Sequence, residues 1–235
     1  MRFIDQFHVL LLDLNGTFMF NSDRLSEAER FGLTYRQLGG HTLNDDEVQG
    51  LILAVVDMMG KIYADPRASQ HFPSVRSCVE QIATPQGLPE REVRLLERVI
   101  AQHEVGVIPP ASAAVLRRLA QTHRLGIVSD IWSTSELYLQ ELQRAGIRAL
   151  FDVIVFSSDY GCVKPSPSLF IKAMEALAVD RTQIVFVGDS LKRDIAGAKA
   201  AGLAAIWINR GVRTGDKGVS SPDLVIQDVR DLVEQ

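Results

Sequence analysis

The chain alternates between short apolar runs and longer segments in which apolar residues recur at helical spacing. The runs are rich in Val, Ile and Leu and are bounded by polar residues. They span residues 8–14, 124–130, 151–159, 183–190 and 203–209. Continuous apolar runs of this kind are typical of parallel strands that are covered on both faces. The pattern therefore predicts a sheet of buried parallel strands.

Helical patterns lie between the later runs. They cover residues 111–123, 133–146, 166–179 and 190–202. The second begins with Ser and Thr, which cap helices, and it ends at Gly146, a typical stop residue. A repeated strand–helix–strand order implies right-handed crossovers. We therefore expect an α/β fold with a doubly wound, Rossmann-like parallel sheet.

A long stretch between the first and second strands breaks this order. Residues 45–63 and 91–104 look like amphipathic helices, with no strand pattern between them. The simplest interpretation is a helical cap domain inserted after the first strand. The expected domains are a core of residues 1–19 and 107–235 and a cap of residues 20–106.

The composition argues against some classes of binding partner and indicates where in the cell the protein acts. The 235 residues are 46% hydrophobic and 23% charged, as expected for a globular protein, and the net charge is −4. No basic block suggests nucleic-acid binding, and no apolar run is long enough for a membrane span. The N-terminus lacks the cleavage site of a signal peptide, and the two cysteines, Cys78 and Cys162, form no CxxC pair. We expect a cytoplasmic location with reduced thiols.

Candidate functional residues follow the predicted strands. In open parallel sheets, ligands bind outside the carboxyl ends of the strands. The polar residues there are Asp13, Asn15, Gly16 and Thr17 after the first strand, Ser129 and Asp130 at the second, Lys164 after the third, and Asp189 with Asp194 after the fourth. Any one of them alone is more simply explained as a helix cap or a solvated charge. Together they bring acids, a hydroxyl and a lysine to one edge of the sheet.

That set of side chains suits phosphoryl transfer. A carboxylate can attack phosphorus and form an aspartyl-phosphate intermediate, and Asp13 is placed for this role. A hard divalent ion must offset the repulsion between two anions, and Mg²⁺ suits a site with few carboxylates. Asp189 and Asp194 could hold it together with Asp13. The phosphate would contact Gly16, Thr17, Ser129, Asp130 and Lys164.

The same residues lie in motifs that resemble the haloacid dehalogenase superfamily, chiefly its phosphatases with a helical cap. The motifs are DLNGT (13–17), IVSD (127–130), VKPSPSLF (163–170) and VGDSLKRDIAGAKAAG (187–202), and the resemblance covers nearly the whole chain. It implies that Asp13 is the nucleophile and that Ser129 and Lys164 bind phosphate. It also implies that Mg²⁺ is held by Asp13, Asp189, Asp194 and the backbone carbonyl of Asn15.

Asn15 departs from this resemblance. Phosphatases of the superfamily usually have a second Asp there, which protonates the leaving group and then activates water. An amide cannot exchange a proton at ordinary pH, and losing general acid–base help typically costs about 10²–10⁴-fold in rate. The predicted catalytic residues are Asp13, Asn15 and Lys164. They indicate a Mg²⁺-dependent hydrolase of small phosphorylated metabolites, with slow turnover as one consequence of Asn15.

Three other functions stay open on the sequence. The scaffold could be a weakly active binding or regulatory protein for phosphorylated ligands. A dehalogenase would use a carboxylate-binding arginine, for which Arg36 is the candidate, and a phosphonatase would need a cap lysine, which only Lys61 supplies. Arg36 is more simply explained as a surface charge, and Lys61 as a cation near a helix end. Candidates for substrate specificity in the cap are Tyr35, Arg36, Gln37, Lys61 and Tyr63.

Overall fold

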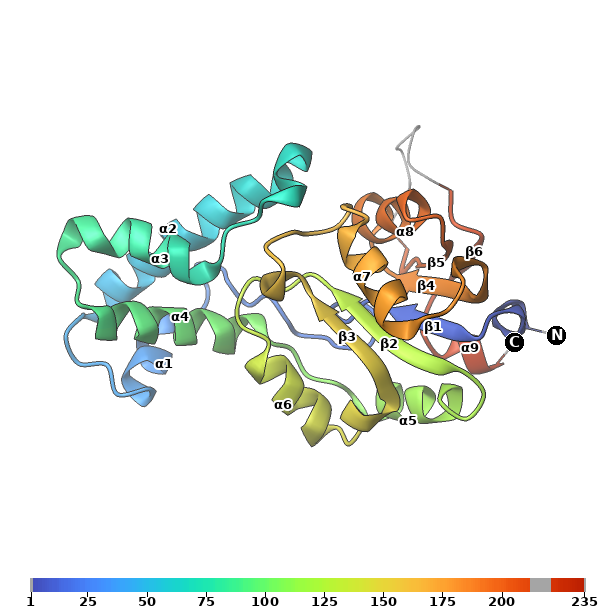
Figure 1. Cartoon of the computed structure of the whole chain (residues 1–235). Helices are drawn as coiled ribbons and strands as arrows, with labels where there is room; N and C mark the ends of the chain where they lie inside the picture. The colour runs from blue at the N-terminus through green and yellow to red at the C-terminus, as the bar shows by residue number, and fades with distance from the viewer. Residues whose placement is uncertain (1, 212–220, 235) are drawn as a thin grey trace.

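A computed structural model of the chain describes residues 2–211 and 221–234. Its centre is a six-stranded sheet with the order β3-β2-β1-β4-β5-β6, and every neighbouring pair is parallel (Figure 1). The strands are β1 (Val9–Leu12), β2 (Arg124–Ser129), β3 (Phe151–Phe156), β4 (Ile184–Gly188), β5 (Ala204–Ile208) and β6 (Leu224–Ile226). The predicted doubly wound parallel sheet is confirmed. The prediction missed β6, because its three residues form too short a run to stand out.

The helices fall into two groups (Figure 1). Those of the inserted segment are α1 (Phe31–Gln37), α2 (Asp45–Ala64), α3 (Val75–Ala83) and α4 (Glu90–Glu104). Those beside the sheet are α5 (Pro110–Leu119), α6 (Glu136–Arg144), α7 (Ser168–Leu177), α8 (Ala196–Ala200) and α9 (Asp231–Glu234). A π-helical turn, η7 (Leu191–Ile195), leads into α8. Among the described residues, no helix is both long enough and apolar enough to cross a membrane.

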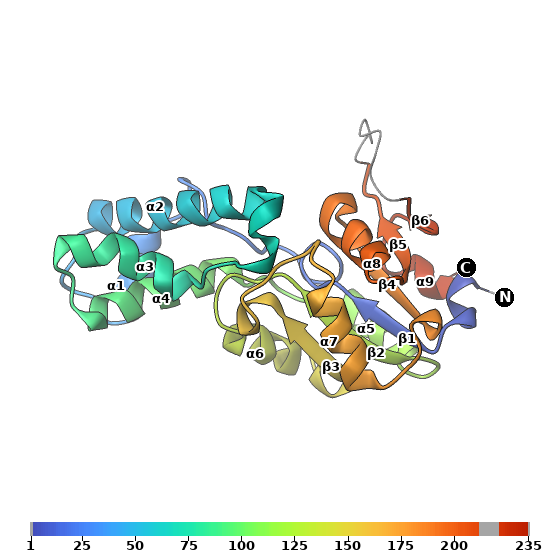
Figure 2. The same cartoon turned by 45° about the horizontal axis from the view of Figure 1, so that its top comes forward.

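The sheet is covered on both faces, as Figure 2 shows. Leu10 and Leu12 of β1 lie in one apolar cluster with residues of α5, α6 and α9. Val9 and Leu11, which point to the opposite face, pack in a second cluster with residues of α7 and α8. Successive side chains of a strand alternate between faces, so a strand buried on both sides must be apolar throughout. This explains the uninterrupted apolar run that predicts β1.

The inserted helices have an apolar core of their own. In α2, Val48, Ile52, Val55 and Met59 recur at helical spacing and are buried against α3 and α4. The helix begins after Asn44, whose side chain accepts a hydrogen bond from the Glu47 backbone in a capping box. The sequence predicts α2 and α4 from their long apolar stripes, but it misses α1 and α3, which span only seven and nine residues.

The helices α1 to α4 form a helical unit, and the six strands with α5 to α9 form a sheet unit. Two adjacent segments of the chain join these units. Phe20 and Val107 exchange backbone hydrogen bonds of 3.0 and 2.8 Å, and the Asp23 amide donates to the carbonyl of Glu104 at 2.9 Å. Gly106 lies so close to the Phe20 carbonyl that a Cβ atom at this position would collide with it. The two segments are therefore paired like two short antiparallel strands, and the chain enters and leaves the helical unit side by side.

Candidate active site

The order of the strands reverses between β1 and β4, which are neighbours at the centre of the sheet. Asp13 follows β1 and Asp189 follows β4. The Asp13 amide continues the ladder by donating to the Val187 carbonyl at 2.9 Å. In open parallel sheets, such a switch point forms a crevice at the carboxyl ends of the strands. The fold thus brings the two acids together at the edge where ligands bind.

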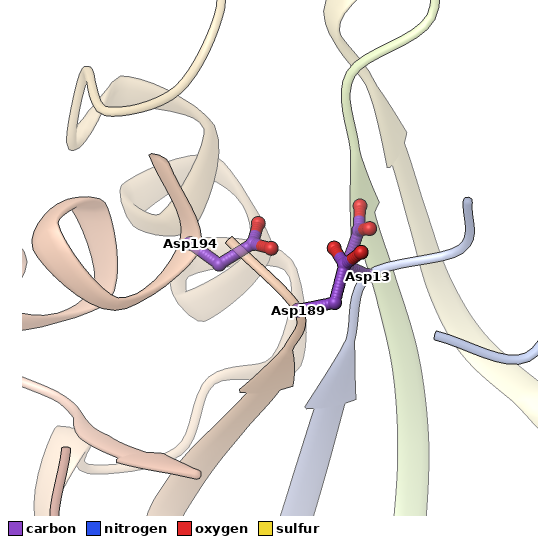
Figure 3. A group of neighbouring side chains, drawn as sticks. All are labelled: Asp13, Asp189 and Asp194. Carbon is purple, nitrogen blue, oxygen red and sulfur yellow. The ribbon is translucent and has the colours of Figure 1, made fainter. Parts of the chain in front are cut away.

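Three carboxylates meet at this edge, as Figure 3 shows. Asp13, Asp189 and Asp194 each offer an oxygen within 4.8 Å of the others. Two glycines provide the space that two of these carboxylates occupy. A Cβ atom on Gly16 would collide with Asp189, and one on Gly188 would collide with Asp194. Asp194 lies in the π-helical turn, and its Oδ2 accepts a hydrogen bond of 2.9 Å from the amide of Ser190, the residue just before that turn.

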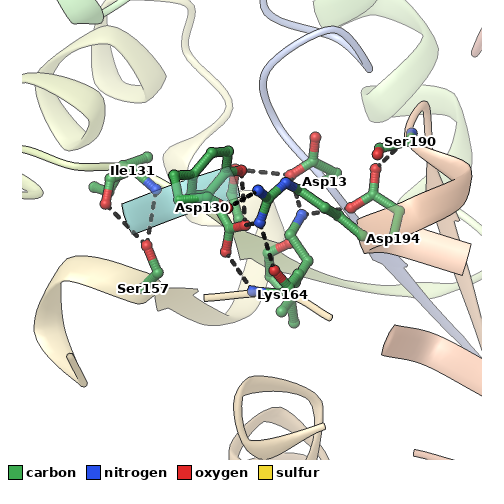
Figure 4. Close-up of polar contacts among 11 residues, drawn as sticks. Asp13, Asp130, Ile131, Ser157, Lys164, Ser190 and Asp194 are labelled. Atoms are coloured by element: carbon green, nitrogen blue, oxygen red, sulfur yellow. Dashed lines mark hydrogen bonds and ion pairs between the residues drawn. The ribbon is translucent and has the colours of Figure 1, made fainter. Parts of the chain in front are cut away.

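Lys164 lies between two of these acids (Figure 4). Its Nζ is 2.6 Å from Oδ1 of Asp13 and 2.6 Å from Oδ1 of Asp194, and it also donates to the Val128 carbonyl at 3.3 Å. The Ser129 hydroxyl donates to the same Asp13 oxygen at 2.8 Å. Both side-chain donors therefore hold Oδ1 of Asp13. Its Oδ2 forms no hydrogen bond within the described ranges 2–211 and 221–234.

Negative charge exceeds positive charge in this cluster. Burial raises the pKa of Asp13 to about 8, with Lys164 opposing the rise and the two other acids adding to it. The pKa of Asp189 is raised to about 6, first by burial and then by the charge of Asp194. A divalent cation would relieve this repulsion, and clustered carboxylate oxygens are the ligands that Mg²⁺ prefers. The donor set therefore fits Mg²⁺.

Two residues that were not predicted hold the backbone at the ends of the central strands: Arg210 holds the loop after β1, and Trp207 holds Asp189 after β4. Gly16 has a left-handed φ of +70°, which favours glycine. Arg210 donates to the carbonyls of Gly16 and Thr17, and the Trp207 indole donates to the Asp189 carbonyl at 2.9 Å. Trp207 lies on β5 and Arg210 lies shortly after it. The rule that ligands gather at strand ends could therefore have pointed to this fifth strand as well.

Two polar side-chain atoms of the loop after β1 lack hydrogen-bond partners among the described residues. Within the described residues, Asn15 Oδ1 and the fully buried Thr17 hydroxyl form no hydrogen bond. Burial raises the pKa of Tyr138 well above its usual range, and the nearby Asn15 side chain opposes the rise. Asn15 lines the pocket described next, whereas Thr17 and Ser129 do not. The structure thus places the Ser129 hydroxyl on Asp13, not along the open space.

A pocket of about 590 Å³ opens above the carboxylates, between the sheet unit and the helical unit. This is within the range typical of small-molecule sites. Its walls come from the sheet unit (Asp13, Asn15, Gly16, Asp130, Trp132, Lys164, Asp189, Ser190, Arg193 and Asp194) and from the inserted segment (Ser22, Asp23, Leu25, Val56, Tyr63 and Glu104). Asp23, Glu104 and Arg193 are not among the predicted site residues, and of these three only Arg193 lies inside one of the sequence motifs.

Glu104 ties the last helix of the inserted segment to the loop after β2. Its carboxylate accepts hydrogen bonds from the backbone amides of Trp132 and Ser133 and from the Ser133 hydroxyl. The side chain is buried, and burial raises its pKa to about 7 even though these donors oppose the rise. Nothing in the local sequence marks this residue, because its partners are about thirty positions away in the chain.

Of the cap residues proposed for specificity, Tyr63 lines the pocket. Tyr35 is buried inside the helical unit and donates to Glu92. The remaining three, which are Arg36, Gln37 and Lys61, are exposed and do not line it. Arg36 forms an ion pair with Asp45, and Lys61 forms one with Asp57 at 2.6 Å. These positions agree with the interpretation of Arg36 as a surface charge and of Lys61 as a cation in the last turn of a helix.

Comparison with known proteins connects this geometry to one family. The model of the family described as haloacid dehalogenase-like hydrolase matches residues 73–208. A phosphoserine phosphatase of Thermus thermophilus is 32% identical over 148 residues, which are 62% of this chain and 58% of that protein. This chain therefore spans less than two thirds of that relative.

Solved structures agree on the fold. A HAD phosphatase from Thermococcus onnurineus is 26% identical, with a TM-score of 0.62 and 96% of each chain covered. A 2-haloacid dehalogenase from Pseudomonas syringae pv. Tomato is 22% identical, with a TM-score of 0.67 and 97% of each chain covered. Proteins described as phosphatases and as dehalogenases thus share this architecture.

Proposed function

Because the chain belongs to the haloacid dehalogenase-like hydrolase family, we propose that it is a Mg²⁺-dependent hydrolase of small phosphorylated metabolites. One observation carries the proposal: the carboxylates of Asp13, Asp189 and Asp194 meet within 4.8 Å at the point where the strand order reverses. The described residues offer no comparable cluster elsewhere. We also propose a cytoplasmic location and a capping role for residues 20–106, whose side chains form one wall of the pocket.

In this proposal, Asp13 is the nucleophile. Lys164 and Ser129 hold its Oδ1, which leaves Oδ2 to attack phosphorus. The bond from phosphorus to the leaving-group oxygen breaks, an aspartyl phosphate forms, and water then hydrolyses it. Asp13, Asp189, Asp194 and the Asn15 carbonyl would hold the Mg²⁺, which when bound would neutralise charge on the transferring group. Gly16, Asp130 and Lys164 line the space for the phosphate.

Asn15 determines which leaving groups are hydrolysed well. Its amide lines the pocket but cannot give up a proton at ordinary pH. Asn15 therefore cannot protonate the departing oxygen, which favours oxygens that leave as stable anions. We expect substrates with good leaving groups, such as acyl or aryl phosphates, to be hydrolysed faster than simple alkyl phosphates.

The same residue favours a second candidate function, a binding protein for phosphorylated ligands with little turnover. The two alternatives from the same superfamily receive less support. Arg36, which a dehalogenase would need near the substrate carboxylate, is paired with Asp45 outside the pocket. Lys61, which a phosphonatase would need as an amine, is exposed and paired with Asp57.

An aryl-phosphate assay separates the two main candidates. We expect the wild-type protein to release the aryl alcohol only with Mg²⁺, and Asp13→Asn to abolish this release. The matched control is Asp152→Asn, because this acid forms an ion pair with Arg124 on the surface. Absence of Mg²⁺-dependent release from the wild type, or equal release from Asp13→Asn, contradicts the hydrolase and favours the binding protein.

A further inference from the structure

Tyr63, near the carboxyl end of α2, connects the helical unit to the active site. Its hydroxyl donates to Oδ2 of Asp130 at 3.0 Å. The guanidinium of Arg193 lies 3.2 Å from the centre of its ring, which is a close cation–π contact, and also donates to the Tyr63 carbonyl. Asp130 and Arg193 belong to the sheet unit, so Tyr63 is held from two sides by residues of the core.

The same two partners hold the backbone of Lys164. The amide of Lys164 donates to Oδ1 of Asp130 at 3.0 Å, and its carbonyl accepts a hydrogen bond of 2.7 Å from Arg193. Figure 4 marks the contact between Asp130 and Lys164 with a dashed line. Asp130 therefore uses one carboxylate oxygen for Tyr63 and the other for Lys164. Arg193 likewise bonds to the backbone carbonyls of both residues.

Other contacts reinforce this junction without touching the carboxylates. The Tyr63 ring packs against Phe72 and Trp132, each with a centroid distance of 5.7 Å. The chain after α2 is attached to the loop before Lys164, because the Phe72 amide donates to the Gly161 carbonyl at 2.8 Å and the Val163 amide donates to the Ser69 carbonyl at 2.8 Å. The segment that carries Lys164 is thus fixed to the helical unit at several points.

We infer that Tyr63 is a positioning residue whose docking on Asp130 and Arg193 fixes both backbone groups of Lys164 and so aligns the lysine ammonium between Asp13 and Asp194. Contact of the helical unit with Asp130 and Arg193 and alignment of the Lys164 ammonium then occur together. The inference rests on the proposed role of Lys164 in the reaction. It assigns Tyr63 no contact with the reacting atoms. Its loss should therefore slow turnover more than it weakens substrate binding.

Kinetics of two tyrosine variants test this coupling. Tyr63→Phe removes the hydroxyl that donates to Asp130 and keeps the ring on Arg193. Losing one hydrogen bond to a charged group should lower kcat about 10-fold and change KM less than about 2-fold. The matched control is Tyr35→Phe, because Tyr35 also donates to a buried carboxylate, that of Glu92, but inside the helical unit. This control should lower Tm and leave kcat within about 2-fold.

A chemical measurement tests the inference without relying on activity. Acetic anhydride at limiting concentration, followed by peptide mass spectrometry, reports the reactivity of Lys164 relative to Lys172. Lys164 is buried and doubly ion-paired, whereas Lys172 lies over the ring of Tyr160 near the surface. Tyr63→Leu, which removes both the hydroxyl and the ring, should raise the relative labelling of Lys164 at least about 5-fold, and Tyr35→Phe should not.

The results of these experiments distinguish failure of this inference from failure of the proposed function. A wild-type protein without Mg²⁺-dependent turnover refutes the proposed function, and the labelling of Lys164 then decides the inference alone. Unchanged labelling in Tyr63→Leu overturns the inference, whatever the kinetics. A Tyr63→Phe effect confined to KM also overturns it, because that result makes Tyr63 a substrate-binding residue.

Discussion

The ammonium of Lys164 lies 2.6 Å from the same Asp13 oxygen that accepts the Ser129 hydroxyl. One carboxylate oxygen of Asp13 is thereby held by two donors. The other remains available to an electrophile or a cation. Lys164 also bonds to Asp194, so a single buried cation keeps two acids of the cluster in place.

Removing the lysine should damage both stability and turnover. In Lys164→Met, the buried carboxylates of Asp13 and Asp194 lose their shared partner, and breaking a buried ion pair typically costs about 3–5 kcal/mol. Urea unfolding with a chelator present measures this loss, and the aryl-phosphate assay should show no turnover. Lys172→Met serves as the control, with both properties near wild type. Stability within about 1 kcal/mol of wild type would refute the structural role of Lys164.

Restoring a proton donor at position 15 should speed the reaction. Asn15→Asp supplies the carboxyl group that the leaving oxygen lacks, and general acid–base help is typically worth about 10²–10⁴-fold. We expect kcat to rise, most for alkyl phosphates, and the double variant with Asp13→Asn to be inactive. If the single substitution leaves kcat flat or lower for both substrate types, proton transfer does not limit the wild-type enzyme.

Alanine substitutions at two glycines with similar φ angles distinguish the effect of backbone strain from that of a steric collision with Asp189. Gly16 and Gly39 have φ values of +70° and +86°, and a Cβ atom would collide with the Asp189 carboxylate at Gly16 but meets nothing within 4 Å at Gly39. Both alanine variants should lose about 1 kcal/mol of stability from backbone strain. Only Gly16→Ala should also weaken Mg²⁺ binding, measured by calorimetry. Equal Mg²⁺ affinity in the two variants would show that the contact between Gly16 and Asp189 does not matter.

Stability should depend on pH through Glu104. Burial raises the pKa of this carboxyl from an ordinary value of 4.5 to about 7. The folded state therefore favours the neutral acid. The resulting stabilisation is complete below about pH 4.5 and is lost as the pH rises through 7. The difference between these pKa values corresponds to about 3 kcal/mol.

The test compares wild type with Glu104→Gln by urea unfolding from pH 5 to pH 8. The glutamine cannot ionise, so the free energy of unfolding of the wild type should fall relative to that of the variant across this range. Glu175→Gln, on the exposed side of α7, is the control and should follow the wild type. Parallel curves for wild type and Glu104→Gln would contradict the raised pKa.

Local patterns in the sequence predicted most of the fold and the ends of the strands. Apolar runs identify β1 to β5 because each of these strands contributes side chains to the apolar clusters on both faces of the sheet, but β6 is too short to form such a run. The acids after β1 and β4 could be paired from sequence alone, since carboxyl ends of parallel strands share one edge. The structure places their carboxylates within 4.8 Å of one another.

Features that depend on distant parts of the chain could not be predicted in this way. Glu104 meets Trp132 and Ser133 only because the helical unit folds back on the sheet. Tyr63 was one of several cap candidates, and the sequence gives no reason to prefer it over Tyr35. Only the packing of α2 decides that one tyrosine reaches Asp130 while the other stays inside the helical unit.

The central claim is that Asp13, Asp189 and Asp194 bind Mg²⁺, and isothermal titration calorimetry at pH 8 tests it most directly. The pKa values of Asp13 and Asp189 are raised, so these acids hold their protons at lower pH. Those protons must leave before a cation binds. We predict one Mg²⁺ per chain for the wild type, weaker apparent affinity at pH 6, and no binding by Asp189→Asn. A wild-type chain that binds no Mg²⁺ at pH 8, or an Asp189→Asn variant that binds it equally well, would contradict the account.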